Sequence, residues 1–231
     1  MFPFFFIVFT DIRDVYFLIG SKQVPQLSSS RHIDVTQPFK IVNDSKSDGV
    51  KRALVIGINY VGSKGELFGC HSDAKNMVDF LKTDQGFEDE NITILMDDGH
   101  HKSPTYRNIM RAFREIAGQS NSGDTVLIHY SGHGGRVKDK TGDENDGYDE
   151  TIIPVDYFRA GQIIDDDINF DLVRKMKKGV LVTAMMDCCH SGTILDLPYR
   201  YRGGDDPGMG MEKEVFYADD DKPRDCCCFI Y

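Results

Sequence analysis

Short apolar runs alternate with amphipathic stretches through the middle of the chain. Four apolar runs, each bounded by polar or glycine-containing segments, lie at residues 53–59, 92–96, 125–130 and 180–186. Continuous apolar runs of this length are typical of strands that are buried on both faces of a sheet. The sequence therefore predicts four buried strands.

The segments between these runs have the three- and four-residue spacing of helices. Two apolar stripes show it: Ala74, Met77, Val78 and Leu81, and then Ile109, Met110, Phe113, Ile116 and Ala117. Ser103 is expected to cap the second helix, with Pro104 in its first turn, and a weaker helical pattern covers residues 167–176. Strands that alternate with such helices predict right-handed βαβ units and an α/β fold in which helix layers flank a mainly parallel sheet.

The two ends of the chain have different patterns. The first twenty residues are apolar, but Asp11, Arg13 and Asp14 interrupt them and no basic residue precedes them. They fit neither a spanning helix nor a signal peptide, so we expect a leader that packs on the domain or is a gene-model artefact, with membrane attachment as the less favoured alternative. We expect a leader and Ser-rich linker at residues 1–49, a folded α/β domain at 50–202 and a flexible acidic tail at 203–231.

Composition and charge limit the classes of binding partner and the cellular compartment that we expect for the protein. The chain is 40% hydrophobic and 28% charged, as is ordinary for a globular protein, and its formal net charge is -10 with a pI near 5.1. This charge disfavours nucleic acid and favours cations or basic peptides. The six cysteines lack the spread of a disulfide framework, so we expect a reducing, cytoplasmic location.

Two strand ends carry candidate catalytic residues. The third apolar run leads into YSGHGG at 130–135, and the fourth leads into DCCHSG at 187–192. Ligand sites gather where parallel strands end, so His133 and either Cys188 or Cys189 can form a thiol and imidazole pair. The amide groups around Gly134 and Cys189 can stabilise an oxyanion. A lone cysteine or histidine is usually structural, but two at matching strand ends, each beside Gly and Ser, favour catalysis.

Two aspartates indicate the charge of the substrate. Asp187 lies two residues before Cys189, on the same side by strand alternation, and Asp73 lies in the first turn of the first predicted helix. Two carboxylates beside a nucleophile attract a basic side chain and repel an acidic one. Asp73 can also stabilise the helix N-terminus through the helix dipole, and both roles can hold.

The acidic stretch at 139–150 is not an EF-hand. When the stretch is aligned on Gly147, the first ligand position falls on Gly142 and the last on Ile153. We interpret residues 143–146 as a solvated acidic loop. Scattered carboxylates can still converge on calcium, which accepts irregular oxygen geometry.

The order and spacing of five motifs resemble one family. YSGHGG, GDENDGYDE, IIPVDY, IIDDD and DCCHSGTILDLPY resemble the large-subunit region of metacaspases, the caspase-like cysteine peptidases of plants, fungi and protists, over residues 51–202. The resemblance implies a caspase-like three-layer fold, His133 as base and Cys189 as nucleophile. It implies cleavage after Arg or Lys, with the pocket on Cys70, Asp73, Ser131 and Asp187. It also implies an activating calcium ion on Asp149, Asp165, Asp166 and Asp196.

Two features depart from the family pattern. Cys188 stands where the family more often has serine, and we interpret it as a small side chain that points into the sheet, in preference to a redox or back-up thiol. Only about forty residues follow Cys189, and they do not have the pattern of a small subunit. The alternatives are therefore a non-proteolytic scaffold or a large-subunit fragment that needs a partner chain, with an open sheet edge as the site of association.

Overall fold

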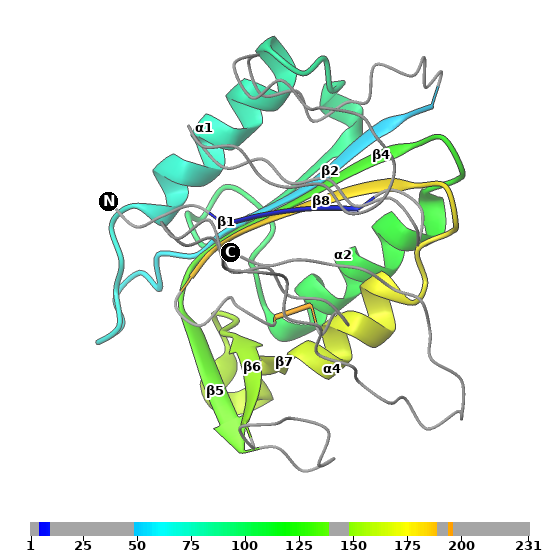
Figure 1. Ribbon diagram of the computed structural model, residues 1–231. Coiled ribbons are helices and arrows are strands. Elements are labelled where there is room, and N and C mark those ends of the chain that lie inside the picture. The colour runs from blue at the N-terminus through cyan, green and yellow to red at the C-terminus, as the bar shows by residue number, and fades with distance from the viewer. Residues whose placement is uncertain (1–4, 10–48, 139–147, 189–193, 196–231) are drawn as a thin grey trace, which may run out of the picture.

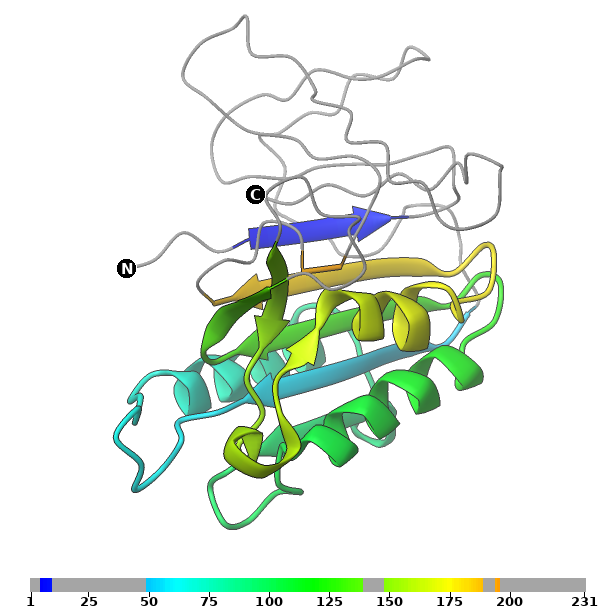
Figure 2. The ribbon, with the colours of Figure 1, turned by 90° about the horizontal axis from the view of Figure 1, so that it is seen from below.

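A five-stranded sheet forms the centre of the molecule. The computed structural model describes residues 49–138, 148–188 and 194–195, together with the backbone of residues 5–9. The strand order in the central sheet is β1-β8-β4-β2-β3; β8, β4, β2 and β3 run parallel, and β1 is antiparallel to β8 (Figure 2). These strands are β1 (Phe5–Phe9), β2 (Lys51–Gly57), β3 (Ile92–Met96), β4 (Thr125–Ser131) and β8 (Leu181–Asp187).

Helices cover both faces of this sheet. Figure 1 shows α1 on one face, with α2 and α4 on the other. The α-helices are α1 (Cys70–Thr83), α2 (Tyr106–Gln119), α3 (Tyr157–Ala160) and α4 (Asp165–Ile168), the 3-10 helix η1 is Asp89–Asn91, and the π-helical turn η2 is Asn169–Val173. The α/β fold with a mainly parallel sheet between helix layers is thus confirmed. No helix in the described ranges is both long and apolar enough to cross a membrane.

Strand alternation divides the core into two clusters. On the α2 face, Ile56, Ile128 and Met186 pack with Phe113 and Ile116. On the α1 face, other residues of the same strands pack with the helix; they are Val55, Leu127 and Met185, with Ala74 and Leu81 of α1. Both faces of β2, β4 and β8 are therefore buried, which explains why their sequences read as continuous apolar runs.

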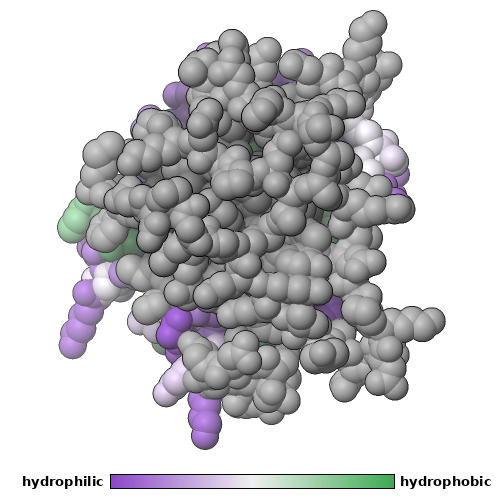
Figure 3. All heavy atoms as spheres, in the orientation of Figure 1, coloured by the Kyte–Doolittle hydropathy of each residue, from purple (hydrophilic) through white to green (hydrophobic). Residues whose placement is uncertain are grey.

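A second, smaller sheet extends from the end of β4. It consists of β5 (Gly134–Lys138), β6 (Tyr148–Ile152) and β7 (Ile163–Ile164), which pair antiparallel in that order. On the face seen in Figure 3, some of the hydrophilic side chains in colour lie at the end of the molecule where Figure 1 places β5 and β6, and others lie along the left-hand margin. This sheet fixes the chain directly after His133, because β5 begins at the next residue.

Three local expectations need correction or addition. The cap of α2 is Thr105 and not Ser103, because the Thr105 hydroxyl accepts a hydrogen bond from the Asn108 N–H at 3.3 Å; Pro104 lies before the helix. The weak helical pattern at 167–176 forms α4 and then the π-helical turn η2 in place of one helix. Part of the apolar leader forms β1, which pairs along the edge of β8. The predicted association at an open sheet edge stays a prediction.

Candidate active site

The ends of β4 and β8 bring the candidate pocket residues together. Ser131 and Asp187 are directly paired in the parallel register of these strands. Helix α1 reaches the same place because Gly57, at the end of β2, allows close contact: a Cβ atom at this position would lie 2.6 Å from the Cys70 carbonyl oxygen. The first turn of α1 can thus place Asp73 beside Ser131, whose hydroxyl donates a hydrogen bond to Asp73 Oδ2 at 3.2 Å.

The candidate pocket brings two carboxylates close to each other. Burial raises the pKa of Asp187 above its usual value, and the nearby Asp73 raises it further. Burial also raises the pKa of the Cys70 thiol, a hydrogen bond with Ser131 acts in the opposite direction, and the charges of Asp73 and Asp187 add to the increase. All four residues predicted for the substrate pocket therefore lie close together. Cys70 is a neutral thiol in this setting, because its thiolate would be buried between two acids.

His133 is held by one carbonyl oxygen and one tyrosine. Its Nε2 lies 2.7 Å from the carbonyl oxygen of Gly65, and its backbone N–H donates to the Tyr60 hydroxyl at 2.9 Å. The rings of Tyr60 and His133 lie with their centroids 4.7 Å apart. A carbonyl oxygen only accepts hydrogen bonds, so the neutral imidazole carries its proton on Nε2 and leaves Nδ1 as the basic nitrogen.

Tyrosines also hold the backbone around His133. The Tyr130 hydroxyl donates to the His133 carbonyl oxygen at 2.7 Å, and the Tyr60 hydroxyl donates to the Ile153 carbonyl oxygen at 2.7 Å. The sequence pattern alone does not single out Tyr60, Tyr130 or Gly65 as contacts of His133. The one available signal was position, since Tyr60 lies just beyond the first buried strand and Tyr130 lies next to Ser131.

The pairing of β5 with β6 fixes the direction of the Gly134 N–H. Gly134 pairs with Ile152 in the antiparallel ladder of β5 and β6, and the Ile153 N–H donates to the His133 carbonyl oxygen at 3.2 Å. That bond marks Gly134 and Ile152 as a non-hydrogen-bonded pair, so the Gly134 N–H points away from β6. Cys189, the other predicted oxyanion donor and the predicted nucleophile, lies outside the described residues.

Cys188 is placed on the opposite face of the sheet from Asp187. Its side chain is half-buried and packs against the cluster on the α2 face, whereas Asp187 lies near Asp73 of α1. This packing agrees with the interpretation of Cys188 as a small side chain that points into the sheet.

The predicted calcium ligands are only partly described. Asp149 and Asp165 are buried, and Asp165 accepts hydrogen bonds from the N–H groups of Glu150 at 2.9 Å and Asp166 at 3.0 Å. Asp196 and the acidic segment 143–146 lie outside the described residues. Within the ranges that are described, no group of three or more His, Cys, Asp or Glu side chains is arranged to hold a metal ion.

Comparison with known proteins identifies the family. The family model described as "Metacaspase, peptidase C14 domain" matches residues 51–198. The chain belongs to the metacaspase family. The match covers every described strand and helix except β1, and it includes both His133 and Cys189.

Individual relatives support the same assignment. Metacaspase III c of Phaeodactylum tricornutum is 51% identical over 185 residues, which are 79% of this chain and 55% of that protein. Metacaspase-1A of Neurospora crassa is 47% identical and is aligned over 68% of this chain and 35% of that protein. Metacaspase-1 of Saccharomyces cerevisiae is 43% identical, with 77% of this chain and 40% of that protein aligned.

A solved structure supports the fold. A crystal structure of a Geobacter sulfurreducens protein superposes with a TM-score of 0.50 at 34% identity, covering 65% of this chain and 56% of that one. This metacaspase chain spans about a third to just over half of the length of the three named metacaspases.

Proposed function

We propose that this metacaspase domain is the catalytic part of a calcium-activated cysteine endopeptidase that cleaves after arginine or lysine. The observation that carries the proposal is the placement of Asp73 and Asp187 together at the ends of β4 and β8, with β4 ending two residues before His133. A peptidase needs a nucleophile, a base and a pocket that selects the side chain before the cut. The motifs supply the nucleophile and the base, and the paired carboxylates suit a cationic side chain.

The proposed reaction proceeds through a thioester. Nδ1 of His133 accepts the thiol proton of Cys189, and the sulfur attacks the carbonyl carbon of the scissile peptide bond. The N–H groups of Gly134 and Cys189 stabilise the oxyanion that forms. The imidazolium then donates its proton to the leaving amine as the C–N bond breaks. A water molecule, deprotonated by His133, hydrolyses the thioester and restores the thiol.

Electrostatics supports the choice of a basic side chain. A guanidinium or ammonium group between Asp73 and Asp187 would offset the repulsion that raises the pKa of Asp187. A substrate carboxylate would add a third negative charge at the same place, which is unfavourable by several kcal/mol in a partly buried site. The pocket therefore favours Arg and Lys and rejects Asp.

The proposed calcium ion would be held by Asp149, Asp165, Asp166 and Asp196. The chemistry of these donors fits the metal, because calcium prefers several carboxylate oxygens and accepts irregular geometry. Two of them, Asp149 and Asp165, are buried on β6 and α4, where a cation would offset their charge. Calcium would supply positive charge that fixes the segments carrying these aspartates.

Paired fluorogenic peptides test the proposal. Peptides ending in Arg and in Asp are compared, with calcium or with a chelator, for the wild type, Cys189→Ala, His133→Ala and Cys188→Ser. We expect calcium-dependent cleavage of the Arg peptide only. We expect its loss in Cys189→Ala and His133→Ala and its retention in Cys188→Ser, which is the matched control because the neighbouring thiol packs in the core.

The negative outcomes distinguish the alternatives. Cleavage of the Asp peptide would overturn the pocket assignment, and equal cleavage in chelator would overturn the calcium assignment. If the folded chain cleaves neither peptide, the scaffold or partner-dependent alternative takes over.

A further inference from the structure

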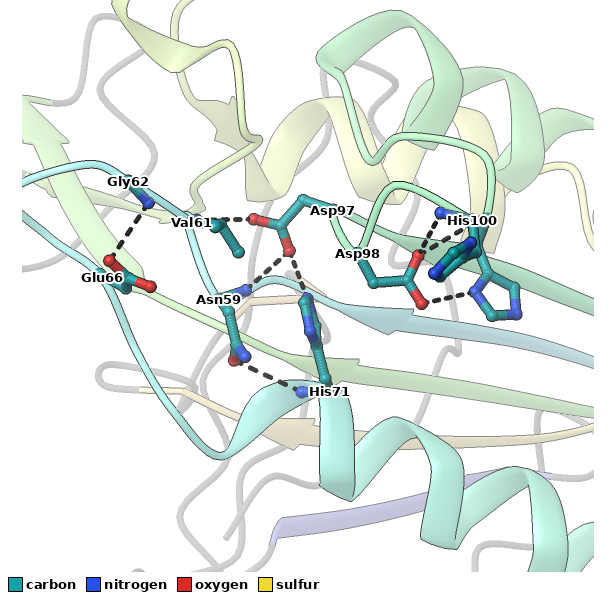
Figure 4. Close-up of polar contacts among 9 residues, drawn as sticks. Asn59, Val61, Gly62, Glu66, His71, Asp97, Asp98 and His100 are labelled. Atoms are coloured by element: carbon teal, nitrogen blue, oxygen red, sulfur yellow. Dashed lines mark hydrogen bonds and ion pairs between the residues drawn. The ribbon is translucent and has the colours of Figure 1, made fainter.

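Asp97, just beyond the end of β3, clamps the loop that follows β2. Figure 4 shows its two carboxylate oxygens directed toward the loop. Oδ1 accepts from the Asn59 N–H at 2.9 Å and Oδ2 from the Val61 N–H at 3.1 Å. The carboxylate therefore binds the two backbone amides on either side of Tyr60.

Tyr60 has a backbone conformation that needs such support. Its φ of 53° is the only positive value among the described residues other than glycine. The left-handed region costs roughly 1 kcal/mol or more for a residue with a Cβ, and it persists where surrounding contacts enforce it. The clamp from Asp97 on both flanking amides provides such contacts, and Tyr60 is itself buried.

The clamped loop supplies two of the contacts that orient His133. The Tyr60 hydroxyl accepts the His133 backbone N–H at 2.9 Å, and the Gly65 carbonyl oxygen lies 2.7 Å from His133 Nε2. The loop returns to Asn59, because the Leu67 N–H donates to the Asn59 carbonyl oxygen at 2.7 Å. A shift of the loop at Asn59 and Val61 would thus move both groups that hold the imidazole.

His71, next to the pocket cysteine on α1, holds Asp97 in turn. Its Nε2 lies 2.6 Å from Asp97 Oδ1, and its backbone N–H donates to the Asn59 side chain at 3.4 Å. Burial opposes ionisation of Asp97, but the hydrogen bonds from His71 and the two loop amides outweigh it and hold the pKa of Asp97 below its usual value. Asp97 is thus a carboxylate with three donors, which suits a fixed clamp.

We infer that Asp97, held by His71, is a positioning residue that sets the orientation and tautomer of His133 through the loop at 58–67. This inference rests on the proposed function for its kinetic consequence. Asp97 does not touch the reacting atoms; it fixes the Tyr60 and Gly65 groups that touch His133. Its removal should lower the rate of the chemical step and leave substrate binding in the separate Asp73 and Asp187 pocket largely intact.

Asp97→Asn tests the inference, with Asp98→Asn as its matched control. Asp98 accepts from two backbone N–H groups and one histidine as Asp97 does, but all three belong to His100 and His101, outside the loop at 58–67 (Figure 4). The amide in Asp97→Asn places a donor against a backbone donor. We expect kcat on the Arg peptide to fall 10- to 100-fold with KM changed less than threefold. We expect wild-type values for Asp98→Asn.

A second measurement does not need peptidase activity. The imidazole ¹⁵N spectrum, with the His133 signals assigned by their absence in His133→Ala, reports which ring nitrogen carries the proton. We expect an Nε2-protonated ring in the wild type and in Asp98→Asn, and a mixture of tautomers in Asp97→Asn. If no peptide is cleaved, the proposed function fails, but this spectrum still decides the positioning role.

Two variants of His71 keep the test decisive if Asp97→Asn does not fold. His71→Leu removes the donor to Asp97, whereas His71→Gln keeps an N–H that can reach it. We expect a loss of kcat and a change of tautomer in His71→Leu that His71→Gln largely restores. An unchanged kcat and an unchanged His133 tautomer in Asp97→Asn, or in His71→Leu if the first variant is unfolded, would overturn the inference.

Discussion

Aspartate has opposite roles at the two edges of the central sheet that are formed by the ends of its parallel strands, one where the strands begin and one where they end. At the edge where β2 and β4 begin, Asp124 accepts hydrogen bonds from the Val50 and Asn121 N–H groups, each at 2.8 Å, and pairs with the Arg52 guanidinium at 2.5 Å. Burial opposes its ionisation, but these donors outweigh burial and lower the pKa of Asp124. At the edge where β4 and β8 end, the pKa of Asp187 is raised by burial and by the neighbouring Asp73.

The difference separates an aspartate whose charge is stabilised by donors within the fold from an aspartate whose ionisation is disfavoured. A carboxylate with donors and a cation is satisfied within the fold, and its ionisation stabilises the folded state. Two neighbouring carboxylates repel each other when both are charged, and a cation bound from solution or from a substrate would offset that repulsion. In the proposed function, the raised pKa of Asp187 belongs to a group that would bind a cationic side chain, whereas the lowered pKa of Asp124 belongs to a structural contact.

The largest expected effect lies at the first of these edges. Asp124→Ala should reduce the free energy of unfolding by about 4 kcal/mol, because it leaves the Arg52 guanidinium and two backbone N–H groups without their acceptor in a partly buried site. Urea denaturation followed by circular dichroism measures this. Asp187→Asn, at the opposite edge, should show no loss of stability. Equal losses of unfolding free energy in both variants would show that Asp124 and Asp187 contribute equally to stability, and the contrast between the edges would be wrong.

His129 lies midway along β4, between the two edges, and its burial predicts a pH dependence of stability. Burial lowers the pKa of His129 to about 4, and a backbone contact at Met185 offsets only part of that. Between pH 6.5 and 4 the unfolded chain binds a proton at this residue that the folded chain does not bind. The contribution of His129 to stability is therefore fully present above pH 6.5 and falls as the pH is lowered to about 4, by roughly 3 kcal/mol.

Stability measured at several pH values in wild type and His129→Leu isolates this contribution. Acidic groups are common to both proteins, so the difference between the two curves belongs to residue 129. We expect the wild type to lose stability relative to His129→Leu as the pH falls through this window. If the free energy of unfolding changed with pH in the same way in both proteins, the pKa of His129 would be the same in the folded and unfolded states.

The pocket edge gives the next effect, which is on activity. In the proposed peptidase, Asp187→Asn should lower kcat/KM for Arg peptides about 100-fold, because a guanidinium loses one of two partly buried carboxylate partners. The change should appear mainly in KM. For the wild type, KM should rise as the pH falls through the raised pKa of Asp187, and the variant should lack that rise. A KM for Arg peptides that is the same in both proteins would exclude Asp187 from the pocket.

The sequence was sufficient for features that depend on local pattern. The parallel strands follow from continuous apolar runs, and the proximity of Asp187 to Ser131 follows from the rule that parallel strands end at one edge. The resemblance added Cys70 and Ser131 to the two acids, and all four residues lie together. Cys189 and Asp196 lie outside the described residues, so their assignments stay predictions.

Features that depend on distant partners could not be read from the sequence. Asp97 binds amides 36 and 38 residues earlier in the chain, and no local signal links an aspartate after β3 to a loop after β2. The positive φ of Tyr60 is equally hidden, since the sequence places no glycine there. The cap of α2 was misplaced by two residues because Ser103 and Thr105, on either side of Pro104, are both suitable caps, and only the Asn108 N–H distinguishes them.

The smallest expected effect comes from a polar contact that lies near the pocket edge but should not affect substrate binding. Thr105 caps α2 shortly after β3 ends, but it faces the Asn108 N–H and not the pocket. Thr105→Ala should reduce the free energy of unfolding by about 1 kcal/mol, and Thr105→Ser, which keeps the hydroxyl, should recover most of it. Thermal denaturation measures both variants, and peptide cleavage at a temperature where both are folded should equal that of the wild type. A loss of cleavage in Thr105→Ala without a loss of stability would mean that Thr105 acts on substrate as well as on the helix. The contrast between a structural edge at Asp124 and a binding edge would then hold only for Asp73 and Asp187.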